Sequence, residues 1–75
     1  MTAEDPAYRK LVNMMGAARA RVILEETLAR LGLEALRTAD DRYRFGEALI
    51  AQGGVLEAVG WSIKVQAVLH GAKKI

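Results

Sequence analysis

The sequence contains no cysteine and only one histidine among its 75 residues. A chain without cysteine forms neither a disulfide bond nor a thiolate zinc site, and one histidine does not make a dedicated metal site. The absence of cysteine also fits a reducing compartment, so we expect a cytoplasmic location. Domains of this size often need an added support, and association between chains is the one that remains.

Long apolar runs and targeting signals are missing as well. The longest run without a charged residue covers residues 48–56, nine residues that include two glycines, whereas a membrane-spanning helix needs about 20 apolar residues. The chain begins with the acidic stretch MTAEDP, whereas a signal peptide begins with basic residues. We therefore expect no membrane partner.

The residue types needed for catalysis are few. Ser62 is the only serine and His70 the only histidine, and eight residues along one helix separate them by about 12 Å. That distance is too long for a nucleophile and its base. Gly53 and Gly54 are followed by Val-Leu-Glu, which does not match a phosphate-binding loop. We predict a protein that is not an enzyme and has no cofactor; an apolar ligand between chains stays an open alternative.

The charge is small but unevenly distributed. A net charge of +2, from 11 basic and 9 acidic residues, is too low to require a nucleic-acid partner. Residues 8–22 contain basic side chains and no acid, residues 23–41 are mainly acidic, and the chain is basic again from residue 42. This order favours self-association, with the acidic segment of one chain near a basic segment of another. Ordinary solvated faces are an equally compatible explanation.

Helix signals are frequent. Asp5 is a good N-cap, Pro6 suits the first helical position and Gly32 suits a helix end, which together predict a helix over about residues 6–31. Apolar side chains recur along it at spacings of three and four on two faces, which implies two packing partners. The first face comprises Tyr8, Leu11, Met15, Ala18 and Val22, and the second comprises Met14, Ala17, Leu24, Leu28 and Leu31.

Two further helices are predicted. Thr38 can cap a helix over about residues 39–52, with two aspartates in its first turn, and Gly53-Gly54 ends it. A third helix follows over about residues 55–71. No alternating strand pattern occurs. Residues 1–75 are therefore predicted to form a single all-α domain of three helices, a long helix followed by a helical hairpin, packed as a homo-oligomeric helical bundle.

Each predicted helix contains an internal glycine: Gly16, Gly46 and Gly60. Glycine costs a helix about 1 kcal/mol relative to alanine, so these positions indicate close helix crossings. In the second helix, Arg42 and Arg44 follow Asp40 and Asp41, which favours local ion pairs.

Residues 55–71, VLEAVGWSIKVQAVLHG, resemble the helix-turn-helix of the LacI-type repressor headpiece. Gly60 stands at the turn position, Ser62 follows it, and His70-Gly71 resembles the dipeptide that ends the recognition helix. Val55, Val59, Trp61 and Leu69 occupy positions that the motif buries. The resemblance implies a DNA-binding protein that uses Lys64 among its contacts.

Other features of the same residues favour a single continuous helix. The motif requires a small residue at position 56 and an aliphatic residue at position 66, where this chain has Leu56 and Gln66. A helix that is apolar on nearly all sides is usually buried. We therefore predict a central helix at a subunit interface. Ser62, Gln66 and His70, spaced by four, form a polar line that sets the register across a two-fold axis. The predicted interface residues are Trp61, Ser62, Val65, Gln66, Val68, Leu69 and His70.

The function predicted from the sequence is that of a small, non-enzymatic interaction or regulatory module. It acts by self-association and by binding a protein partner that the sequence does not identify. The alternative is a small dimeric DNA-binding protein that uses basic helix surfaces or a degenerate helix-turn-helix. Its nucleic-acid contacts would come from Arg9, Lys10, Arg19, Arg21, Lys64, Lys73 and Lys74.

Overall fold

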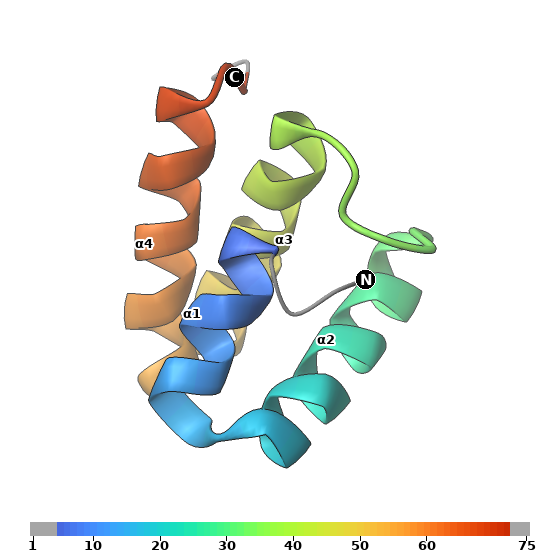
Figure 1. Cartoon of the computed structure of the whole chain (residues 1–75), viewed down its shortest axis with the longest axis vertical. Helices are drawn as coiled ribbons and strands as arrows, with labels where there is room; N and C mark the ends of the chain where they lie inside the picture. Colours follow the sequence, from blue (N-terminus) through green and yellow to red (C-terminus); the bar gives the residue numbers. More distant parts are fainter. Residues whose placement is uncertain (1–4, 73–75) are drawn as a thin grey trace.

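The computed structural model describes residues 5–72, which form an all-α bundle of four helices (Figure 1). The helices are α1 (Pro6–Met15), α2 (Ala17–Leu31), α3 (Ala39–Gln52) and α4 (Val55–Leu69). Helices α3 and α4 form an antiparallel hairpin, α1 lies beside α4, and α2 diverges from α1 on the opposite side. The described residues contain no strand. The all-α class is therefore confirmed, whereas the predicted count of three helices is wrong.

The difference lies at Gly16, where the predicted helix over residues 6–31 is interrupted. Gly16 has φ +86° and ψ 162°, a conformation that is essentially restricted to glycine. A continuous helix of this length would extend about 39 Å, beyond the longest dimension of the molecule, 30 Å. The break at Gly16 lets Leu11 of α1 and Leu24 of α2 enter the same core. The two predicted apolar faces therefore do not continue across it, and Val22 and Met14 are exposed.

The helix ends follow the capping signals of the sequence. The Asp5 carboxylate accepts hydrogen bonds from the backbone N–H groups of Ala7 and Tyr8, at 2.9 and 3.3 Å. Thr38 and Asp41 form a reciprocal capping box at the start of α3. Gly32 ends α2 in the left-handed conformation. Because each of these contacts is local, helix α3 has the predicted bounds, and α4 ends only two residues before the predicted position.

Helices α3 and α4 approach each other closely within their hairpin, and glycines permit this approach. A Cβ atom at Gly60 would lie 2.6 Å from the carbonyl oxygen of Gly46, and one at Gly46 would lie 2.8 Å from the carbonyl oxygen of Gly60. The two helix backbones therefore touch directly. The predicted close crossings are confirmed for Gly46 and Gly60 and are wrong for Gly16, where a Cβ atom would meet nothing within 4 Å.

The core lies between this hairpin and the α1–α2 pair. Phe45 and Leu49 of α3 and Ile63 of α4 are almost completely buried against residues of the first two helices. The buried members of the main core are Ala7, Leu11, Ala20, Leu24, Leu28, Leu36, Phe45, Leu49, Val59 and Ile63. Only one side of α4 takes part in this core, so α4 lies at the edge of the chain and not at its centre.

An ion pair connects the start of α1 to α3. The Arg42 guanidinium Nη2 lies 3.1 Å from Asp5 Oδ2, and the Asp5 side chain is only 6% exposed. The predicted local ion pair of Arg42 is therefore replaced by one with a residue 37 positions away. Asp5 thus caps α1 and anchors it to α3 at the same time.

Candidate interaction surface

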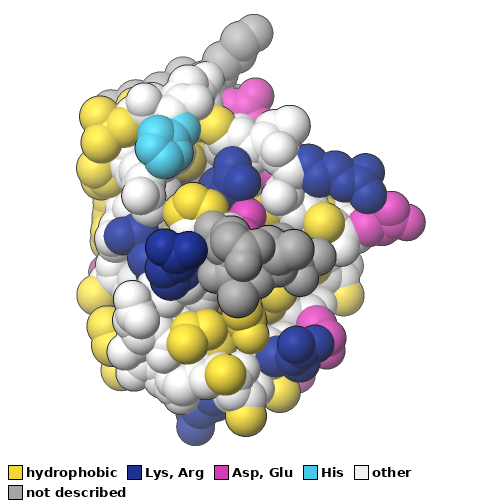
Figure 2. All heavy atoms as spheres, in the orientation of Figure 1, with side chains coloured by type: hydrophobic (Ala, Val, Ile, Leu, Met, Phe, Trp, Pro, Cys, Tyr) yellow, Lys and Arg dark blue, Asp and Glu magenta, His cyan; other side chains and the backbone are white. Residues whose placement is uncertain are grey.

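The outward side of α4 carries exposed apolar side chains. Trp61, Val65 and Leu69 are 53%, 57% and 78% exposed, and Val68 is also exposed. We call these four residues the outer face of α4. In Figure 2, hydrophobic side chains line the edge of the molecule where Figure 1 places α4. Large apolar side chains gathered on one surface are characteristic of interaction sites.

The helix geometry explains this exposure. Val59, Gly60, Ile63 and Ala67 point into the core or against α3 and are buried. Because α4 is apolar around most of its circumference, the side away from the core is apolar too. Residues 55–69 form one helix that continues through Gly60 and Trp61. The turn required by the helix-turn-helix resemblance is therefore absent, and the prediction of a single helix is confirmed.

A lysine holds the tryptophan of this surface in place. Lys64 Nζ lies 4.7 Å from the ring centroids of both Trp61 and Tyr43, within the range of a cation–π interaction. The same ammonium lies 3.7 Å from Glu47 Oε2. This contact restricts the exposed Trp61 side chain, so packing a partner on it costs less of the side chain's conformational entropy.

These side chains border a shallow hollow on the outer face. Its volume is about 220 Å³, and its lining is mostly apolar. The lining residues are Tyr43, Trp61, Lys64, Val65, Val68 and Leu69. A hollow next to a protruding Trp61 offers a socket for an apolar side chain of a partner.

The predicted polar line borders the outer face. Ser62 and His70 are exposed, and Gln66 is half-buried. None of these three side chains forms a hydrogen bond with another residue in the range 5–72. Their donors and acceptors therefore face solvent or an incoming partner. Ser62 lies within α4, and His70 is the residue that caps its C-terminal end. The described residues contain no group of three side chains suited to a metal ion.

The predicted nucleic-acid contacts within the described residues are distributed over α1, α2 and α4. Arg9, Arg19 and Arg21 are exposed, and Lys10 is half-buried. The Lys64 side chain is only 16% exposed and is paired with Glu47. Lys73 and Lys74 lie outside the described residues.

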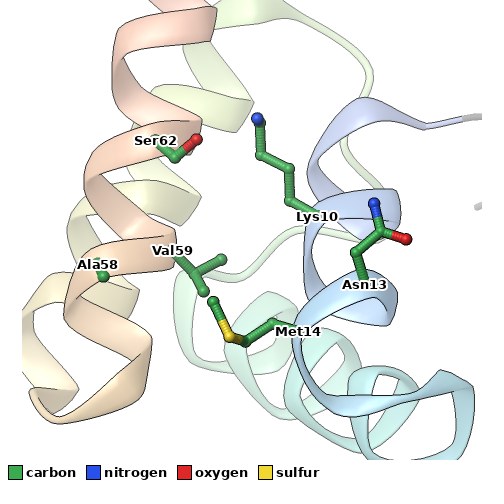
Figure 3. A pocket seen from close by; sticks show the side chains of 6 residues that line it. All are labelled: Lys10, Asn13, Met14, Ala58, Val59 and Ser62. Atoms are coloured by element: carbon green, nitrogen blue, oxygen red, sulfur yellow. The ribbon is translucent and has the colours of Figure 1, made fainter.

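Sequence reasoning missed a groove between α1 and α4, which Figure 3 shows from close by. Met14 of α1 reaches toward Val59 of α4, and Lys10 and Ser62 face one another farther along. The hollow has a volume of about 270 Å³ and is lined by Lys10, Asn13, Met14, Ala58, Val59 and Ser62. The sequence signal was the acid-free basic stretch beside Met14 and Met15, but the groove itself depends on how α1 lies against α4.

Comparison of the chain with protein-family models, with curated proteins and with solved structures gives no match in any of the three. Among the described residues, no helix combines the length and the apolar character needed to cross a membrane. The function is therefore inferred from the geometry of the outer face of α4 and of the groove beside it.

Proposed function

We propose that this chain is a non-enzymatic interaction module that associates with a second copy of itself through the outer face of α4 and binds a further protein partner. The observation that carries the proposal is the exposed apolar side of α4, where the Lys64 ammonium lies over the ring of Trp61. Buried aromatic anchors of this kind contribute a large share of the binding energy in protein interfaces. The proposed location is the cytoplasm, which suits a chain without cysteine.

A second copy is the occupant that fits this face best. None of the four side chains that define it is charged, and Lys64, which lines its hollow, is paired with Glu47 of the same chain. Two copies can therefore meet without burying unpaired like charges. A two-fold axis covers both faces at once, because each copy presents the same patch. A standard interface buries about 800 Å² per partner, which is roughly one-sixth of the 4626 Å² surface of this chain.

The polar line has a defined role in this dimer. Ser62, Gln66 and His70 carry donors and acceptors at the border of the apolar face, where the equivalent residues of the second copy can meet them. Hydrogen bonds at such positions fix the register of two helices, because any shift leaves polar groups unsatisfied. Apolar packing supplies affinity, and the polar line supplies alignment.

DNA binding has less support. The uninterrupted α4 removes the turn of the helix-turn-helix, and its outward side is apolar where a recognition helix needs polar contacts. Lys64 is engaged with Glu47 and two rings. The exposed arginines of α1 and α2 remain as a basic surface, which we interpret below in terms of a protein partner.

Sedimentation velocity across a hundredfold dilution tests the proposal. We expect a dimer at micromolar concentration and above, and a monomer for Val65→Glu, because a carboxylate in the centre of the apolar contact would be desolvated without a partner. Val22→Glu is the matched control: Val22 is 52% exposed on α2, close to the 57% of Val65, and this variant should remain dimeric. A wild-type chain that stays monomeric at 100 µM would refute self-association.

A further inference from the structure

A second hollow adjoins the groove beside α1 at Met14. This hollow has a volume of about 480 Å³ and is lined by Met14, Met15, Arg19, Ile23, Val55 and Leu56. Met14 lines both hollows, which are therefore adjacent, and we call the two together the α1–α4 groove. Along α4 it runs from Val55 to Ser62, about 10 Å of helix length. None of the four residues that define the outer face lines it, although Ser62, next to that face, does.

The charges along the groove are all of one sign. Lys10 lines one hollow and Arg19 the other, and no acidic side chain lines either of them. Neither cation forms an ion pair with another residue in the described part of the chain. Arg9 and Arg21 are exposed on the same two helices. An occupant with negative charge near both ends of the groove would therefore meet cations whose charge is not neutralised locally.

The floor of the groove is apolar and adaptable. Met14 is 52% exposed and extends from α1 toward Val59 (Figure 3). Methionine is unbranched and has a polarisable sulfur, so it adapts to partners of different shape and is common at helix-binding surfaces. With Met15, Ile23, Val55 and Leu56 alongside, the floor offers apolar contacts over its whole length.

We infer that the α1–α4 groove binds an acidic amphipathic helix of a partner protein. A length of about 10 Å corresponds to two turns, which accommodates anchor residues at positions i, i+3 or i+4, and i+7 of a docked helix. The apolar anchors would lie on the methionine floor, and the acidic residues beside them would reach Lys10 and Arg19. This inference names the partner class of the proposed interaction module and rests on that function.

A second copy fits this groove poorly. The acidic candidate within the chain is the exposed side of α2, with Glu25 and Glu26. Docking α2 of one copy into the groove of another would join two different surfaces, and such head-to-tail contacts continue into rings or open filaments. A dimer through the outer face of α4 is closed and leaves every groove residue except Ser62 free for a different protein.

Fluorescence anisotropy with a designed peptide tests the inference on the full chain. The probe is an 18-residue labelled peptide with leucines at i, i+3, i+4 and i+7, glutamates at four positions beside them, and alanine elsewhere to favour a helix. A second probe has lysine in place of every glutamate, and a third has the acidic composition in scrambled order. We expect the acidic helix to bind with a dissociation constant in the micromolar range. Both other peptides should bind at least about tenfold more weakly, a difference of about 1.4 kcal/mol in binding free energy.

Charge-reversal variants locate the binding site. Lys10→Glu and Arg19→Glu should each weaken binding of the acidic helix about tenfold, because each replaces an attraction with a repulsion. Arg30→Glu is the matched control: it reverses an exposed cation on α2 that lines neither hollow, and binding should change less than about twofold. Circular dichroism of each variant establishes that it is folded before binding is compared.

Several results would overturn the inference. They are equal binding of the acidic and basic peptides, an effect of Arg30→Glu as large as that of Lys10→Glu, or no binding of the acidic helix at 100 µM. Binding to duplex DNA or to vesicles of anionic phospholipid, lost in Lys10→Glu while the peptide does not bind, would assign the groove to that class of partner instead. Sedimentation of the same variants keeps the two proposals apart, because groove variants should remain dimeric and Val65→Glu should still bind the peptide.

Discussion

At Gly60 the backbone of α4 touches the backbone of α3, so a single methyl group has no space there. A Cβ atom would lie 2.6 Å from the Gly46 carbonyl oxygen and 2.9 Å from the Ile50 backbone nitrogen, and neither atom can move without moving α3. Gly60→Ala should lower the free energy of unfolding by about 1–3 kcal/mol, although alanine favours helix by about 1 kcal/mol. Urea unfolding measures the change.

The reverse substitution at an exposed helix position isolates the propensity contribution. Ala18→Gly in α2, where Ala18 is exposed, should cost about 1 kcal/mol. If Gly60→Ala proved as stable as the wild type, the direct contact of the two backbones would be disproved.

The Asp5 carboxylate caps α1 and also connects it to Arg42 of α3. Asp5→Asn keeps an oxygen that can cap α1 but leaves the Arg42 guanidinium, whose side chain is 22% exposed, without its anion. The Arg42 Nε atom already has no hydrogen-bond partner among the described residues. We expect a loss of about 1–3 kcal/mol in thermal or urea unfolding.

The double variant Asp5→Asn with Arg42→Met should recover part of this loss, because it removes the unpaired charge. Glu34→Gln breaks the exposed pair between Glu34 and Arg37 and should change stability by less than about 0.5 kcal/mol. Equal losses in the free energy of unfolding for Asp5→Asn and Glu34→Gln would mean that the Asp5–Arg42 pair stabilises the fold no more than an exposed ion pair does.

For the helices, the sequence predicted the features that contacts between neighbouring residues determine. The helix ends at Asp5, Gly32 and Thr38 follow from hydrogen bonds between residues a few positions apart. The residue types that form such bonds can be recognised in the sequence. The interruption at Gly16 depends on the distant packing of Leu11 and Leu24 into one core. A glycine inside an apolar pattern is compatible with both a close crossing and a break, so its role became clear only in three dimensions. The α1–α4 groove was missed for the same reason.

Gly16 also yields a prediction about how α1 and α2 are joined. Gly16→Ala should destabilise the protein by about 1–3 kcal/mol, and the cause is backbone strain, because a Cβ atom there would meet nothing within 4 Å. A chain synthesised with D-alanine at position 16 should recover the lost stability, since its mirror-image preference accommodates a φ of +86°. Calorimetric unfolding compares the three chains. Loss of stability in the D-alanine chain equal to that in Gly16→Ala would exclude backbone strain as the cause.

For the whole molecule, the proposed dimer links stability to protein concentration. The core of one chain is small, and the outer face of α4 is apolar and exposed until a second copy covers it. If folding and association form one step, each tenfold rise in concentration should raise the Tm by about 4 °C for a dimer of this size. Scanning calorimetry from 5 to 500 µM measures this slope, and Val65→Glu should abolish it while Val22→Glu retains it. Because unfolding of a folded monomer does not depend on concentration, a Tm that is constant over this range in the wild type would mean that the second copy contributes nothing to the stability of the fold.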